Sequence, residues 1–161
     1  MEQTDLRKGN PVLVEVIRDG EVIQTIRTYN ERVDAGAFWQ YERMSKGESG
    51  YNPLLYIALS TDNLTPLKTH TTLSNEITTN GLARTSCGSP INYTAPTSLN
   101  GSASFQIKVT FNVTGTGSIT VRSAALFDAA SGGNMFAEAN FNTAATVQNG
   151  DTLNVTWTIT F

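Results

Sequence analysis

Two segments near the end of the chain alternate apolar and polar residues without exception, and this pattern constrains the fold more than any other feature. In residues 104–113 the apolar positions are Phe105, Ile107, Val109, Phe111 and Val113. In residues 151–161 they are Leu153, Val155, Trp157, Ile159 and Phe161. A period of two is typical of an antiparallel strand with one buried face. Burial of one large apolar side chain stabilises by roughly 1.5–3 kcal/mol, so these residues alone suffice to hold two sheets together.

Further strand signals extend this pattern along the chain. Apolar or alternating runs cover residues 12–16, 22–26, 54–59, 118–127 and 135–141, and Gly-rich turns separate several of them. Asp19-Gly20 lies between the first two runs and predicts a hairpin, because both residues tolerate the positive φ of a type I′ turn. We therefore predict a mainly β protein: an antiparallel, jelly-roll-like β-sandwich with an N-terminal β-hairpin.

Two shorter elements are predicted outside the strands. Asp34 can cap a short helix that contains Phe38, Trp39 and residues 41–44. A helical turn is predicted at residues 73–77, with Thr71 or Thr72 as its cap.

Charge divides the chain unevenly. Residues 1–50 hold 16 of the 25 charged side chains, and the remaining 111 residues hold nine. Ser, Thr and Asn occupy 49 of the 161 positions instead. We predict two parts: residues 1–50, with an arm, the hairpin and the short helix, and residues 51–161, the sandwich. The low charge of the second part suggests that much of its surface meets protein.

Composition excludes several classes of function. The net charge is −3 and no Lys/Arg cluster is present, which argues against nucleic acid as a partner. No apolar run is long enough for a membrane helix, and the first residues lack the plan of a signal peptide. Cys87 is the only cysteine, so an internal disulfide is excluded and a reducing cytoplasm is expected as the place of synthesis.

The residues that could support catalysis are few. We expect His70 to be an exposed loop histidine and Cys87 to be a structural or surface thiol, because neither has the neighbours of a nucleophile motif. Asp128, Glu138 and Asp151 could form an acid–base pair, but they lie in or near turns, where carboxylates commonly cap loops. We therefore predict no enzyme activity, no metal site and no cofactor.

The polar face of the last strand is the strongest candidate for an interaction surface. Its outward residues are Asn154, Thr156, Thr158 and Thr160. One interpretation is a solvated strand with residues of high β-propensity. The other is a protein interface of neutral hydrogen bonds, which avoids the desolvation of buried charge. Three aromatic residues are further interface candidates, with a core role as the alternative: Phe38, Trp39 and Tyr41.

The C-terminal segment resembles virion proteins of tailed bacteriophages. The matching residues are Leu126, Phe127, Gly132, Met135, Phe136, Ala137, Phe141, Gly150, Asp151, Thr152, Leu153, Trp157 and Phe161, and residues 12–23 resemble the opening strands of some phage head proteins. The resemblance implies a capsid decoration (cement) protein that is made in the host cytoplasm and stabilises the head. Its expected partners are the major capsid protein and further copies of itself, on the capsid surface of the virion. A tail, fibre or baseplate component is the alternative within the virion, and a carbohydrate-binding β-sandwich is the alternative from a different class.

Overall fold

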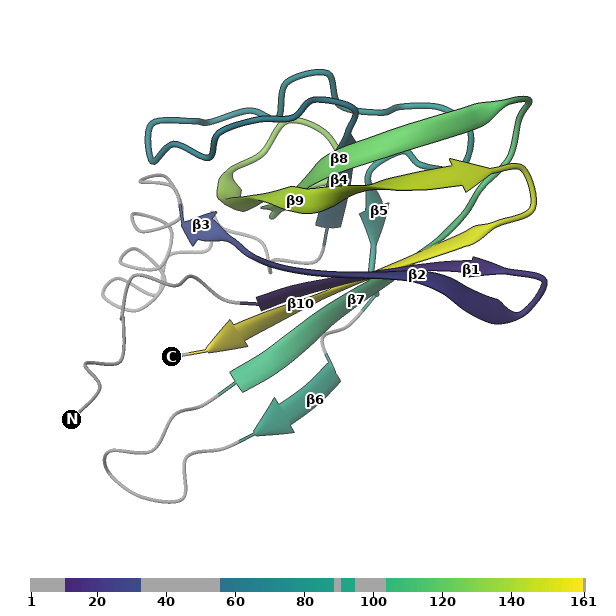
Figure 1. Cartoon of the computed structure of the whole chain (residues 1–161). Coiled ribbons are helices and arrows are strands. Elements are labelled where there is room, and N and C mark those ends of the chain that lie inside the picture. Colours follow the sequence, from purple (N-terminus) through teal and green to yellow (C-terminus); the bar gives the residue numbers. More distant parts are fainter. Residues whose placement is uncertain (1–10, 33–55, 89–90, 95–103, 161) are drawn as a thin grey trace.

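The computed structural model describes residues 11–32, 56–88, 91–94 and 104–160, which form two antiparallel β-sheets (Figure 1). The strands are β1 (Pro11–Arg18), β2 (Glu21–Tyr29), β3 (Glu31–Arg32), β4 (Tyr56–Ser60), β5 (Thr85–Ser86), β6 (Ile91–Thr94), β7 (Ser104–Asn112), β8 (Ser118–Phe127), β9 (Met135–Gln148) and β10 (Thr152–Thr160). Sheet A has the order β2-β1-β10-β7-β6, and sheet B has the order β3-β9-β8-β4-β5. The predicted β-sandwich is confirmed.

The two perfectly alternating segments become neighbouring strands in the middle of sheet A. β7 and β10 pair along their whole length, from Asn112 opposite Thr152 to Ser104 opposite Thr160. The predicted hairpin is also confirmed, since Asp19 and Gly20 have φ values of 51° and 82° and join β1 to β2. The predicted helix, including Phe38, Trp39 and Tyr41, and the predicted boundary after residue 50 lie outside the described residues.

The main hydrophobic core lies between the two sheets. Sheet A contributes its alternating residues, of which Trp157, Val155 and Val14 are completely buried. Sheet B contributes Ala124 and Leu126 from β8, together with several residues of β9. Because β1 pairs with β10 and carries Val12, Val14 and Val16 into this core, the hairpin is part of the sandwich.

A bulge in β2 changes the alternation predicted for the hairpin. The pairing with β1 shifts between Val16, which lies opposite Gln24, and Ile17, which lies opposite Val22. The extra residue leaves Val22 and Ile23 about half exposed, at 52% and 49%. The sequence pattern grouped Val22 with the buried Ile26, and this was wrong because alternation cannot show where a strand inserts a residue.

The outer face of sheet B is covered by the chain itself. Residues 61–84 cross this face as a long loop, drawn in teal above β8 and β4 in Figure 1. Beneath the loop, Leu73 packs in a second small core with Ala58, Ala125, Phe127 and Met135. The helical turn predicted at residues 73–77 is wrong: Glu76 forms an isolated bridge with Ser60 instead, and the Ile77 amide donates to the Leu59 carbonyl over 2.8 Å.

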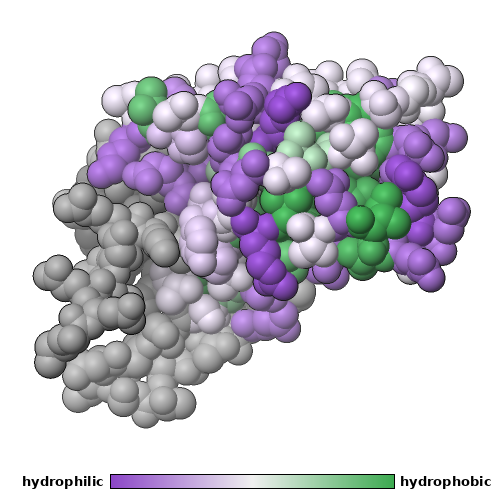
Figure 2. All heavy atoms as spheres, viewed as in Figure 1, coloured by the Kyte–Doolittle hydropathy of each residue, from purple (hydrophilic) through white to green (hydrophobic). Residues whose placement is uncertain are grey.

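Side chains join the two sheets along the side of the sandwich where β2 faces β9. Gln24 Nε2 donates to the Ala144 carbonyl (2.9 Å), and Thr28 Oγ1 donates to the Asn140 carbonyl (2.8 Å). In the other direction, Asn142 Nδ2 donates to the carbonyl of Arg27 (3.2 Å). Figure 2 shows this side of the molecule, with hydrophobic surface between and beside β9 and β2 and hydrophilic residues around it. These bonds tie the edge of sheet A at β2 to β9 of sheet B.

Gly81 lies where the covering loop closely approaches the backbone at the end of β7. Its φ is +74°, and a Cβ there would lie 1.9 Å from the Asn112 carbonyl oxygen at the end of β7. Gly81→Ala combines left-handed strain with a backbone clash, so we expect a loss of about 3 kcal/mol or more in the free energy of unfolding. Gly20→Ala is the matched control, because Gly20 has φ +82° but open space around the added methyl group. It should lose only about 1 kcal/mol. Equal losses in urea denaturation would contradict the close approach at Gly81.

Candidate binding face on sheet A

The two outer faces of the sandwich differ in how much of the chain lies over them. Residues 61–84 cover sheet B, whereas no segment of the described chain crosses the outer face of sheet A. The predicted interface residues of β10 lie on this second face, since β10 alternates between a buried and a more exposed side. The outer face of sheet A is therefore the principal surface on which the described part of the chain can meet another molecule.

Hydrogen bonds between side chains link three strands on this face. Thr110 Oγ1 donates to Asn154 Oδ1 (2.7 Å), and Gln106 Nε2 donates to Thr158 Oγ1 (3.2 Å). Asn92 Nδ2 of β6 in turn donates to Gln106 Oε1 (2.5 Å). These hydrogen bonds account for part of the Thr- and Asn-rich pattern of β10, because the side chains of Asn154 and Thr158 are hydrogen-bonded to β7 of the same sheet. Asn154 is only 9% exposed as a result.

The other two predicted residues of β10 are more accessible. Thr156 is half-buried and Thr160 is exposed. Nothing in the structure tests whether the four residues form a protein interface, so that role stays a prediction.

A shallow trough of about 230 Å³ runs across one end of the face. Its floor lies on β1 and β10, and longer side chains of β2 and β7 stand on either side. The residues that line it are Pro11, Val12, Leu13, Arg27, Thr28, Tyr29, Gln106, Thr156 and Thr158. The trough forms because residues with short side chains occupy the middle strands, between Tyr29 and Arg27 on one side and Gln106 on the other.

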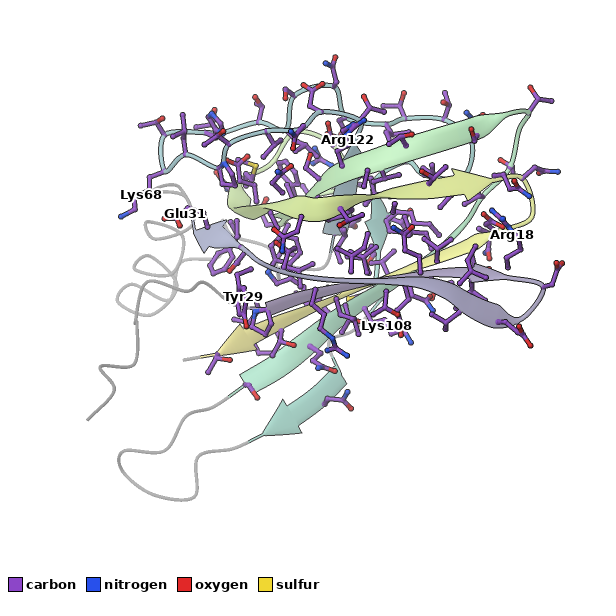
Figure 3. All side chains as sticks on the ribbon, viewed as in Figure 1. Arg18, Tyr29, Glu31, Lys68, Lys108 and Arg122 are labelled. Carbon is purple, nitrogen blue, oxygen red and sulfur yellow. The ribbon has the colours of Figure 1, made fainter. Side chains whose placement is uncertain are left out.

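Two cations lie in or beside the trough. Arg27 lines it, and Lys108 is the cross-strand partner of Thr156 in its floor. Both side chains are exposed, and neither forms a hydrogen bond or an ion pair with the described residues. Tyr29 is 55% exposed. In Figure 3, Tyr29 and Lys108 belong to sheet A, whereas Arg122 belongs to sheet B.

The aspartates among the catalytic candidates have structural roles. Asp128 accepts hydrogen bonds from the Asn134 amide (2.6 Å) and from Asn134 Nδ2 (2.9 Å), and so closes the turn between β8 and β9. Asp151 accepts two bonds of 2.9 Å from the Arg18 guanidinium and one from the Gln148 amide. The Arg18 hydrogen bonds hold the pKa of the Asp151 carboxyl below its ordinary value of 3.8.

His70 and Glu138 are brought together, which sequence reasoning missed. Glu138 lies opposite Ala125 on the covered face of sheet B and is completely buried. The Leu67 amide donates to Glu138 Oε1 over 2.8 Å, and His70 Nδ1 forms a hydrogen bond with the same oxygen over 2.6 Å, while Oε2 has no partner among the described residues. The expectation of an exposed loop histidine is corrected, since only 35% of the side chain of His70 is exposed. With Glu138 inaccessible, this pair fixes the covering loop to sheet B.

Cys87 and a metal site are the remaining candidates from the sequence. Cys87 is a free, half-buried cysteine that packs against the main core, and burial raises the pKa of its thiol. Within the described ranges, His, Cys, Asp and Glu side chains do not gather in threes that could hold a metal ion. The described part also contains no helix with the length and hydropathy needed to cross a membrane.

The fold defines the class of the protein as an antiparallel β-sandwich, in which the described residues cover the outer face of sheet B but not that of sheet A. The chain belongs to the family of the podophage GP4 fiber I protein gp80, whose model matches residues 44–158, more than half of the chain. It is therefore a structural protein of a phage virion. No curated protein matches the chain. The matched segment contains β4 to β9 and most of β10, whereas β1, β2 and β3 precede it.

Glu138→Ala tests how the covering loop is held. Removal of the carboxylate takes the acceptor from the Leu67 amide, so hydrogen exchange at Leu67 should become at least about tenfold faster. Glu138→Gln keeps an oxygen at this position and should leave exchange at Leu67 closer to that of the wild type. The amides of β10 provide the internal control and should not change. Unchanged exchange at Leu67 in Glu138→Ala would show that other contacts hold the loop.

Arg18→Gln tests the ion pair with Asp151 through its pH dependence. Because the pKa of Asp151 is lower in the folded state than in the unfolded state, the pair stabilises the fold above pH 3.8. This stabilisation disappears as the pH falls through the folded pKa. The variant should therefore have a lower Tm than the wild type at pH 7, and the difference should vanish near about pH 2. Arg122→Gln, an exposed arginine without a partner in the described part, is the control. A difference in Tm that did not depend on pH would contradict the role of the Asp151 charge.

Proposed function

We propose that the protein is a component of a phage fibre, and that the outer face of sheet A is its recognition surface. The family match carries the first part of this proposal, because the family is described as a fiber protein and its model covers most of the sandwich. The fold supports the second part, because the covering loop lies over sheet B and no segment of the described residues covers the outer face of sheet A. The protein's role is then to bind and to assemble, without catalysis, metal or cofactor.

The fibre assignment replaces capsid decoration as the favoured role within the virion. The resemblance of the C-terminal segment pointed first to a decoration protein bound to the major capsid protein, with a tail or fibre component as the alternative. The family match supports that alternative better than the decoration role. The partners we propose are accordingly neighbouring virion subunits and further copies of this chain, since most assemblies of soluble proteins are symmetric homo-oligomers. We propose no nucleic acid or membrane partner.

The position of the protein in the virion tests the fibre assignment. Antibodies raised against the purified full chain would be applied to intact virions and detected by immunogold electron microscopy. We expect the label on the fibres at the tail end of the particle. Quantitative mass spectrometry of the same virions, with isotope-labelled peptides from this chain and from the major capsid protein, should give far fewer copies of this chain.

The opposite pattern would overturn the assignment. Label spread over the capsid shell, together with a copy number in fixed ratio to the major capsid protein, would restore the decoration role. Virions that are labelled with pre-adsorbed antibody provide the control for nonspecific binding.

A further inference from the structure

We propose that the trough on sheet A binds one ring of an acidic saccharide, with a carboxylate of the sugar placed between Arg27 and Lys108. The proposal rests on the proposed function in one respect, because it names the partner of the same open face. Its evidence, however, comes from the shape, the chemistry and the charge of the trough itself.

The size of the trough favours a small ring over a larger ligand. Sites for drug-sized ligands usually have volumes of roughly 300–1,000 Å³, and the trough measures about 230 Å³. No segment of the described residues closes it along the face, so a longer chain can continue beyond the ring that it holds. A flat protein surface would leave this hollow unfilled, whereas a sugar ring with its protruding hydroxyl groups can occupy it.

The residues that line the trough match the two kinds of surface on a sugar. Tyr29, 55% exposed at the edge of the trough, offers an aromatic face to the C–H groups of a ring. Thr156 and Thr158 offer hydroxyl groups that both donate and accept hydrogen bonds. The hydrogen bonds from Asn92 to Gln106 and from Gln106 to Thr158 orient the side chains of Gln106 and Thr158 before any ligand arrives. Preorganised polar groups reduce the entropy lost on binding.

The charges select an acidic sugar over a neutral one. Arg27 and Lys108 flank the floor of the trough from opposite sides, and neither has a hydrogen bond or ion pair with the described residues. A guanidinium group binds a carboxylate through charge-assisted hydrogen bonds in a fixed geometry. The carboxylate of this face, Glu15, lies opposite Asn154 and Thr25, one row farther from the trough. Among the described residues of this face, the two cations therefore outnumber the carboxylate.

The trough joins the part of the chain that matches the family with a part that precedes it. Gln106, Lys108, Thr156 and Thr158 lie within residues 44–158, whereas Arg27, Tyr29 and the lining residues of β1 lie before them. The aromatic group and one of the two cations thus come from outside the matched segment.

The first experiment screens the full chain, fluorescently labelled, on a glycan array that carries uronic-acid and sialic-acid oligosaccharides beside neutral ones. We expect binding to acidic members and little to the neutral members. Calorimetry with tetragalacturonate and with its methyl ester then separates charge from shape, because the two differ in the carboxylate charge. If the array selects uronic acids, the ester should bind at least about tenfold more weakly. If it selects sialic acids, the same comparison is made with a sialyl oligosaccharide and its ester.

Matched variants locate the binding on the surface. Arg27→Gln and Tyr29→Ala should each weaken binding of the selected acidic glycan by about tenfold or more. Arg122→Gln removes an exposed arginine from the other sheet and should bind as the wild type does. Circular dichroism and thermal melting would show that all three variants are folded, as expected for exposed residues.

Three results would overturn the proposal. They are no binding to any acidic glycan at millimolar concentration, equal binding of the acid and its ester, and binding that Arg27→Gln and Tyr29→Ala leave unchanged. Concentration-dependent self-association that Tyr29→Ala abolishes, without glycan binding, would assign the trough to a protein contact instead. These measurements use the isolated chain, so their failure is distinct from a failure of the fibre assignment, which depends on the position of the protein in the virion.

Discussion

The pairing of β10 with both β1 and β7 is the interaction on which the rest of the structure depends. It places the last strand at the centre of sheet A, between a strand from the start of the chain and one from its second half. Leu153, Val155, Trp157 and Ile159 of the predicted pattern share the inner side, and Trp157 is completely buried there. A slip of one residue would send this apolar set to the outer face, so burial determines the register.

The same register produces the functional asymmetry of the molecule. Once the apolar residues of β10 and β7 face inward, the Thr, Asn and Gln residues between them must face outward, and their side chains bond across the strands. The outer face of sheet B differs from that of sheet A, because Ala58 and Ala125 give it an apolar centre that residues 61–84 must cover. The buried carboxylate of Glu138 then holds this cover through Leu67 and His70. Folding thus covers the outer face of sheet B, whereas no segment of the described residues covers that of sheet A.

Sequence reasoning succeeded where a local pattern determined the structure and failed where distant segments did. Strict alternation predicted β7 and β10, and Asp19-Gly20 predicted the hairpin, because each depends on neighbouring residues. The contact between His70 and Glu138 joins positions 68 residues apart, and no spacing rule could predict it. The bulge at Val22 and Ile23 also depends on a partner strand. So does the bridge between Glu76 and Ser60, which lies where a helical turn was predicted at Leu73–Ile77. For the candidate site, the sequence predicted the polar side of β10. It predicted neither the trough nor its two cations, because these depend on residues that three other strands place beside β10.

In the proposed binding site, the hairpin that precedes the segment matched by the family supplies one side of the trough. In the segment that matches the family, Gln106 forms one wall of the trough and Thr158 forms part of its floor. Their amide and hydroxyl groups can form hydrogen bonds with many ligands. A second wall exists only because β1 pairs with β10 and carries β2 alongside it. The side-chain bonds from Gln24 and Thr28 to β9 hold this hairpin against the other sheet, so its position is fixed from two directions. Changes at Tyr29 or Arg27 would thus alter the ligand while the core stays intact, since both side chains point to solvent and contribute little to folding.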